Sequence, residues 1–131
     1  MSLETRLERG TNMDESILTS IKKLLGITED YTHFDADITM HINAIFMVLS
    51  DLGVGPKEGF MIVDKDDTWT DFLPDGKLLS AVKSYMYLRV KLLFDPPLGS
   101  ASMTSMDNII KEFEWRMNCL VDPGEGDNQN E

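Results

Sequence analysis

The sequence predicts an all-α protein, a small bundle of four main helices with a long loop between the second and the third. Apolar residues recur at helical spacing in four separate segments of the 131-residue chain. The most apolar of these segments is Lys77–Phe94, which ends at the sequence Asp95-Pro96-Pro97. Proline cannot continue a helix, and it pushes the preceding residue into an extended conformation. A chain of this length has room for one domain with a core.

Capping residues delimit the first two helices. Asp14 is predicted to cap the first helix and Gly26 to end it, with one narrow apolar stripe between them. The second helix is predicted over about residues 35–52, capped within residues 31–37 and ended by Gly53. Its main apolar arc consists of Ile38, Ile42, Ile45, Phe46, Val48, Leu49 and Leu52, with His41 inside the arc.

The second helix has a further apolar stripe on its far side. This stripe is thin and consists of Met40, Ala44 and Met47. One core-facing side of a monomer does not explain two stripes, so we predict that the thin stripe is an interface. Large apolar groups outside the core stripes also suggest interfaces, and these groups are Phe60, Trp69 and Trp115. The alternative is that the long loop folds back and covers some of them.

Residues 53–76 form the long loop and show no extended periodicity. Loops of this length are uncommon in compact domains and are usually functional. Within the loop, residues 60–63 are predicted to form a short strand and residues 68–73 a helical turn.

The fourth helix is predicted over about residues 104–120, with its cap within residues 102–105. Trp115 projects almost opposite the core stripe of this helix. The core stripe consists of Met106, Ile109, Ile110, Phe113, Met117 and Leu120.

The third helix, Lys77–Phe94, is apolar over more than half of its circumference, which predicts neighbours on two sides. Arg89 lies in the middle of this apolar arc, where an unpaired guanidinium would be costly. We therefore predict a carboxylate partner. Glu114 is the favoured candidate, and Glu112 and Asp95 are the alternatives. The pair either anchors the core or joins two subunits.

The composition narrows the function classes. The net charge is −11, with 23 acidic and 12 basic residues, so the chain is a poor ligand for a phosphate backbone. No apolar run is long enough to span a bilayer, and no secretory signal follows the N-terminus, which predicts a cytosolic protein or one released by lysis. The single cysteine, Cys119, excludes an internal disulfide and a cysteine metal cage, and it is predicted to be a packing residue.

Signals for catalysis are weak. The chain has no Gly-rich phosphate loop, and Cys119 has no histidine nearby in the sequence. His33, Asp35 and Asp37 are either metal ligands or capping and turn residues. The second interpretation is favoured, because alternating residues in a loop do not define a coordination geometry. We expect no enzyme activity, no catalytic residue, no cofactor and no metal.

Residues 1–13 are expected to be a flexible N-terminal segment, and residues 14–121 to form one helical domain. Residues 122–131 are acidic and contain no apolar residue, so we expect a disordered tail.

Several stretches resemble a known family. They are residues 15–27 (ESILTSIKKLLGI), 67–73 (DTWTDFL), 85–97 (YMYLRVKLLFDPP) and 110–117 (IKEFEWRM). The chain resembles the small head–tail connector, or adaptor, proteins of long-tailed bacteriophages, which are often called phage DNA-packaging proteins. The resemblance covers roughly residues 14–121.

The resemblance implies a helical subunit of the virion that assembles with copies of itself into a ring under the portal protein. It implies that the ring extends the DNA channel and receives a tail or stopper protein, with assembly in the cytoplasm of the bacterial host. DNA would pass through without sequence-specific binding, and no membrane would be involved. The alternative function is an acidic helical regulatory module that binds one host protein, for instance as a DNA mimic.

Overall fold

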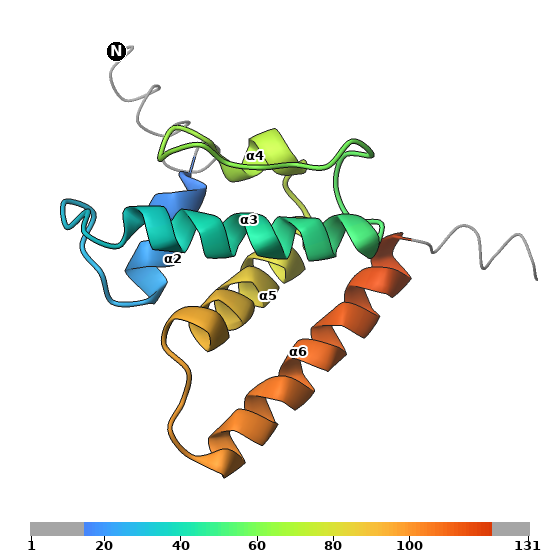
Figure 1. The fold of residues 1–131 in the computed structure, drawn as a ribbon. Helices are drawn as coiled ribbons and strands as arrows, with labels where there is room; N and C mark the ends of the chain where they lie inside the picture. The colour runs from blue at the N-terminus through green and yellow to red at the C-terminus, as the bar shows by residue number, and fades with distance from the viewer. Residues whose placement is uncertain (1–14, 122–131) are drawn as a thin grey trace, which may run out of the picture.

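A computed structural model describes residues 15–121 of the chain. Within this range the chain forms helices and no strand (Figure 1). Their bounds are Ile17–Leu24 (α2), Asp35–Asp51 (α3), Trp69–Phe72 (α4), Lys77–Phe94 (α5) and Ser100–Val121 (α6). The prediction of an all-α protein with four main helices is confirmed. The predictions for residues 1–13 and 122–131 lie outside the described residues, as does residue Asp14 itself.

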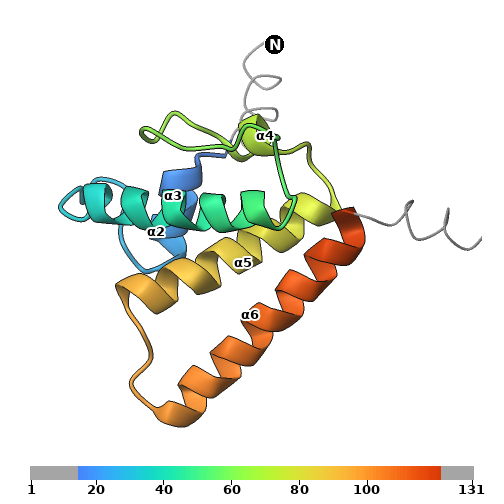
Figure 2. The ribbon, with the colours of Figure 1, turned by 45° about the vertical axis from the view of Figure 1, so that its right-hand side comes forward.

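Helix α5 lies at the centre of the bundle. It packs against α2, α3 and α6, and Figure 2 shows it between α3 and α6. The wide apolar arc of the sequence explains this position, because α5 has to bury side chains toward more than one neighbour. Its buried residues are Leu79, Val82, Tyr85, Met86 and Val90.

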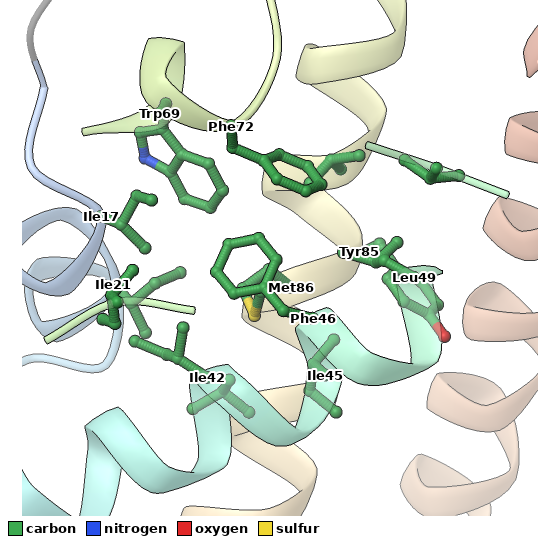
Figure 3. Packing of buried hydrophobic residues seen from close by; sticks show 14 of the residues in the cluster. Ile17, Ile21, Ile42, Ile45, Phe46, Leu49, Trp69, Phe72, Tyr85 and Met86 are labelled. Carbon is green, nitrogen blue, oxygen red and sulfur yellow. The ribbon is translucent and has the colours of Figure 1, made fainter. Parts of the chain in front are cut away.

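The core forms where α2, α3, α4 and α5 meet (Figure 3). Aromatic rings fill the space between α3 and the long loop. The ring centroid of Phe46 on α3 lies 4.7 Å from that of Phe72 and 5.0 Å from that of Phe60. Ring pairs at such distances add stability beyond the area they bury. The loop is therefore part of the core and is held against α3.

Trp69 is a core residue, and the prediction that it lies on the surface is wrong. Only 2% of its surface is exposed, and its Nε1 donates to Ser20 Oγ over 2.9 Å. Phe60 is half-buried and packs against Phe46 and Phe72. The physical reason is that the long loop folds back over α3, the alternative considered for these residues.

The predicted strand at residues 60–63 does not form. The amide of Asn43 on α3 replaces a strand partner: its Nδ2 donates to Ile62 O over 3.0 Å, and its Oδ1 accepts from Ile62 N over 2.8 Å. The backbone groups of Ile62 are therefore paired without a sheet. The helical turn predicted at residues 68–73 is present as α4, where Asp71 Oδ2 accepts from Thr68 N over 3.0 Å.

Two helix boundaries differ from the predictions. Helix α2 is capped by Ser16, whose Oγ accepts from Thr19 N over 3.1 Å. This cap lies two residues after the predicted cap, Asp14. Helix α6 begins at Ser100, four residues earlier than expected. Its first turn projects beyond the core and has exposed side chains, so apolar periodicity does not detect it.

Candidate interaction surfaces

The outer face of α3 presents an uninterrupted stripe of exposed residues. Met40 and Met47 are 61% and 68% exposed, and Ala44 between them is exposed as well. Asp37 and Asp51 continue the stripe at its two ends and are also exposed. We call these five residues the α3 seam. The thin stripe of the sequence thus lies on the surface of the monomer.

A groove between α5 and α6 forms a second surface. Trp115 borders it and is 68% exposed, opposite the core-facing side of α6, as expected. Lys77 and Arg116 add two positive charges to its walls. The apolar and small side chains in the groove are Ser80, Ala81, Ser84, Phe113, Trp115, Cys119 and Leu120. We call it the α5–α6 groove.

Three residues of α6 are more exposed than the sequence indicated. Cys119 is exposed, so the prediction that it is a packing residue is wrong. Ile109 and Leu120, assigned to the core stripe, are 43% and 39% exposed. The reason is geometric: α6 packs mainly on α5, so a narrow strip around Ile110 and Met117 is enough to cover the contact.

Apolar side chains also gather near the turn between α5 and α6, a surface that sequence reasoning missed. Leu93 is 50% exposed and Met103 38%, and Leu98 in the turn is fully exposed. Leu98 belongs to no periodic segment, and only its position after the two prolines signals that it projects outward.

Arg89, Tyr85 and Glu114 form a polar cluster that links α5 to α6. Arg89 Nη1 lies 3.2 Å from Glu114 Oε2 and donates to Tyr85 Oη over 3.0 Å. Tyr85 Oη in turn donates to Glu114 Oε2 over 2.7 Å. Of the three carboxylates considered for Arg89, Glu114 is thus the one beside it, and it belongs to the same chain. Sequence reasoning missed Tyr85, which it assigned to the apolar arc.

The cluster changes the acidity of Tyr85. Burial, and after it the hydrogen bond to Glu114, raise the pKa of Tyr85 well above its ordinary value. A tyrosine hydroxyl is protonated at physiological pH in any case, and the raised pKa keeps it a donor to higher pH. Nothing in this arrangement activates a nucleophile, because a raised pKa works against deprotonation.

Asp35 is engaged in an ion pair and not in a cluster with His33 and Asp37. Lys22 Nζ, on a side chain only 3% exposed, lies 2.8 Å from Asp35 Oδ1 and donates to Glu29 O over 3.0 Å. The His33 ring packs on Phe34 with a centroid separation of 4.8 Å. Among residues 15–121, no group of three acidic, histidine or cysteine side chains could hold a metal ion. The same range contains no helix long and apolar enough to cross a membrane.

A small helical protein with apolar side chains on several separate surfaces is typical of a subunit that works in an assembly. The family described as phage connector protein matches residues 17–124, from the first residue of α2 to just beyond α6. The chain belongs to this family of bacteriophage head–tail connector proteins, which is structural and not enzymatic. No curated protein and no solved structure matches the chain.

Proposed function

We propose that this chain is the subunit of a ring in the virion that lies between the portal protein and the tail. The ring extends the DNA channel and binds the portal on one side and a tail or stopper protein on the other. Assembly takes place in the cytoplasm of the bacterial host. Membership of the connector family is the observation that supports this role most directly.

Closed rings need heterologous contacts, in which two different surfaces of each subunit meet. The monomer offers such surfaces: the α3 seam lies on one helix, and the α5–α6 groove lies between two others. A further apolar area at Leu93, Leu98 and Met103 is separate from both in the sequence. These surfaces provide for neighbours in the ring and for at least one other partner.

The charge of the chain agrees with DNA passage. A net charge of −11 repels the phosphate backbone, so a channel lined by such subunits would not retain DNA. The rival function, a regulatory module that mimics DNA, uses the same charge but predicts a monomer or dimer that binds a single host protein.

The decisive experiment combines the purified chain with the portal protein encoded in the same genome. We expect electron micrographs of the mixture to show rings of this chain stacked on the portal, and these particles to bind the tail or stopper protein. Binding to naked DNA is expected to stay undetectable at physiological salt. The proposal would be contradicted if the chain did not bind the portal and, as a monomer or dimer, bound a host protein instead.

A further inference from the structure

We propose that neighbouring subunits are joined by docking the α3 seam of one copy into the α5–α6 groove of the next. The inference rests on the proposed ring and specifies which surfaces meet in it. It assigns a role to every residue of the seam, and it identifies the occupant of the groove as a second copy of this chain.

The spacing of the seam is the first argument. Asp37, Met40, Ala44, Met47 and Asp51 follow one another at intervals of three, four, three and four residues. This alternation is the repeat of a coiled-coil seam, the pattern of a helix that packs lengthwise on other helices. At 1.5 Å per residue the seam is about 21 Å long. No element of the same chain among residues 15–121 covers it, since all five residues are exposed.

The groove offers the matching surface. Its α5 side has the small residues Ala81 and Ser84, which allow another helix to approach closely. Its α6 side has Trp115 and Leu120. Methionine side chains adapt to irregular gaps and make favourable sulfur contacts with aromatic rings. Met40 and Met47 are therefore suited to pack against such a wall, with Ala44 at the closest approach.

Charge is the second, independent argument. Asp37 and Asp51 are exposed and form no ion pair within residues 15–121, and the same is true of Lys77 at the groove. Arg116 has only an exposed contact to Glu112 at 3.3 Å, one turn away on the same helix, and such pairs contribute little. In the proposed contact an acidic seam therefore meets a groove with two cations, a complementarity that selects partner and orientation.

The same charges oppose the symmetric alternative. If two seams packed on each other, an antiparallel pairing would set Asp37 against Asp51 of the partner copy, and a parallel pairing would set each aspartate against its own counterpart. Both arrangements place like charges together. Docking of seam into groove avoids this repulsion. An open row of copies then has one free seam at one end and one free groove at the other until the ring closes.

Cross-linking tests the contact directly, because Cys119 lies in the groove and is the only cysteine of the chain. Met40→Cys, Ala44→Cys and Met47→Cys are each combined with Cys119→Ser and mixed with the unmodified chain. A disulfide requires Cα atoms within about 7 Å, so three seam positions sample the register. Asn108→Cys with Cys119→Ser, at an exposed position of α6 outside the groove, is the matched control.

Under mild oxidation we expect at least one seam cysteine to form a covalent heterodimer with Cys119, at a yield about tenfold above the Asn108 control. Mass spectrometry of the linked peptides identifies the two cysteines. The inference is overturned if seam cysteines link mainly to each other, if Cys119 links mainly to Cys119, or if no seam position exceeds the control.

An assay of ring formation on the portal distinguishes failure of the seam-and-groove contact from failure of the proposed ring. Ala44→Glu in the seam and Ser84→Glu in the groove replace exposed residues, and each is expected to reduce ring formation at least tenfold, whereas Asn108→Glu leaves it unchanged. Circular dichroism checks that the variants are folded. Rings that form equally well from both variants would refute the seam-and-groove contact and leave the ring intact as the function. Failure of the unmodified chain to form rings would instead refute the proposed function.

Discussion

The hydroxyl of Tyr85 donates to Glu114 Oε2 over 2.7 Å and thereby ties the central helix α5 to α6. The ring of Tyr85 is fully buried, whereas its hydroxyl reaches the partly exposed carboxylate. Tyr85→Phe keeps the ring and removes the link, and we expect a loss of about 1–2 kcal/mol in the free energy of unfolding at pH 7. Urea denaturation measures this difference.

The loss of stability caused by Tyr85→Phe is expected to depend on pH. The pKa of Tyr85 is raised in the folded state above its ordinary value of 10.0, so the stabilisation is fully present below pH 10. As the pH rises above 10, the unfolded chain loses the proton first, and the advantage of the native protein over Tyr85→Phe shrinks by at most about 1.4 kcal/mol per pH unit. A difference that stays constant up to pH 11 would show that the hydroxyl is not coupled to the fold.

Arg89 contributes to the same link from the other side. Arg89→Met removes the contact to Glu114 at 3.2 Å and the donor to Tyr85 at 3.0 Å, and we expect it to lower the unfolding free energy by about 1 kcal/mol. Arg116→Met is the control, since its pair with Glu112 is exposed and should cost less than about 0.5 kcal/mol. Equal losses in the two variants would contradict a special role of the Arg89 cluster.

The prediction of the main helices succeeded where burial is periodic. The ends of α5 follow directly from its apolar arc and the prolines behind it, and the arc of α3 matches its buried residues Ile38, Ile42, Ile45, Phe46 and Leu49. The first turn of α6 was missed because it touches no core. Periodicity reports which side of a helix is covered, and it has no information where nothing covers the helix.

The surfaces were predictable in part. The stripe of Met40, Ala44 and Met47 is visible in the sequence because it repeats at helical spacing on the side of α3 opposite the main apolar arc. Trp69 and Trp115 cannot be told apart this way, since both lie outside a core stripe. The burial of Trp69 depends on a non-local event, the return of the long loop onto α3, which is held by the paired hydrogen bonds between Asn43 and Ile62. Trp115 lies on α6, beside the α5–α6 groove, and stays exposed.

Asn43 provides a test of how that loop is held. Asn43→Asp keeps the acceptor for Ile62 N but removes the donor to Ile62 O, whereas Asn43→Ala removes both. We expect losses of about 1 and about 2 kcal/mol, with faster amide hydrogen exchange concentrated in residues 54–68. Uniform acceleration across all helices, or none in the loop, would argue against this anchoring role.

Gly55 illustrates a close contact that the sequence does not reveal. Its φ is +97°, and a Cβ atom there would clash with the ring of Phe72, within the aromatic cluster. Gly59 has a similar φ of +90° but open space around it. Gly59→Ala should therefore cost about 1–2 kcal/mol from backbone strain alone, and Gly55→Ala about 1–3 kcal/mol more from overpacking. Thermal unfolding of both variants measures the difference, and identical melting temperatures would contradict the tight fit around Phe72.

Substitutions at the two tryptophans distinguish an effect on folding from an effect on assembly. Trp69 is buried and donates to Ser20 Oγ, so Trp69→Ala should lower the unfolding free energy by about 3–5 kcal/mol. Trp115 is 68% exposed, and Trp115→Ser should change the stability of the monomer by no more than about 0.5 kcal/mol. Because Trp115 forms part of the α5–α6 groove, its fluorescence should be quenched by iodide in the free chain and protected in the ring on the portal. If Trp115 remained open to iodide after assembly, the groove would not be where subunits meet, whatever the stability measurements showed.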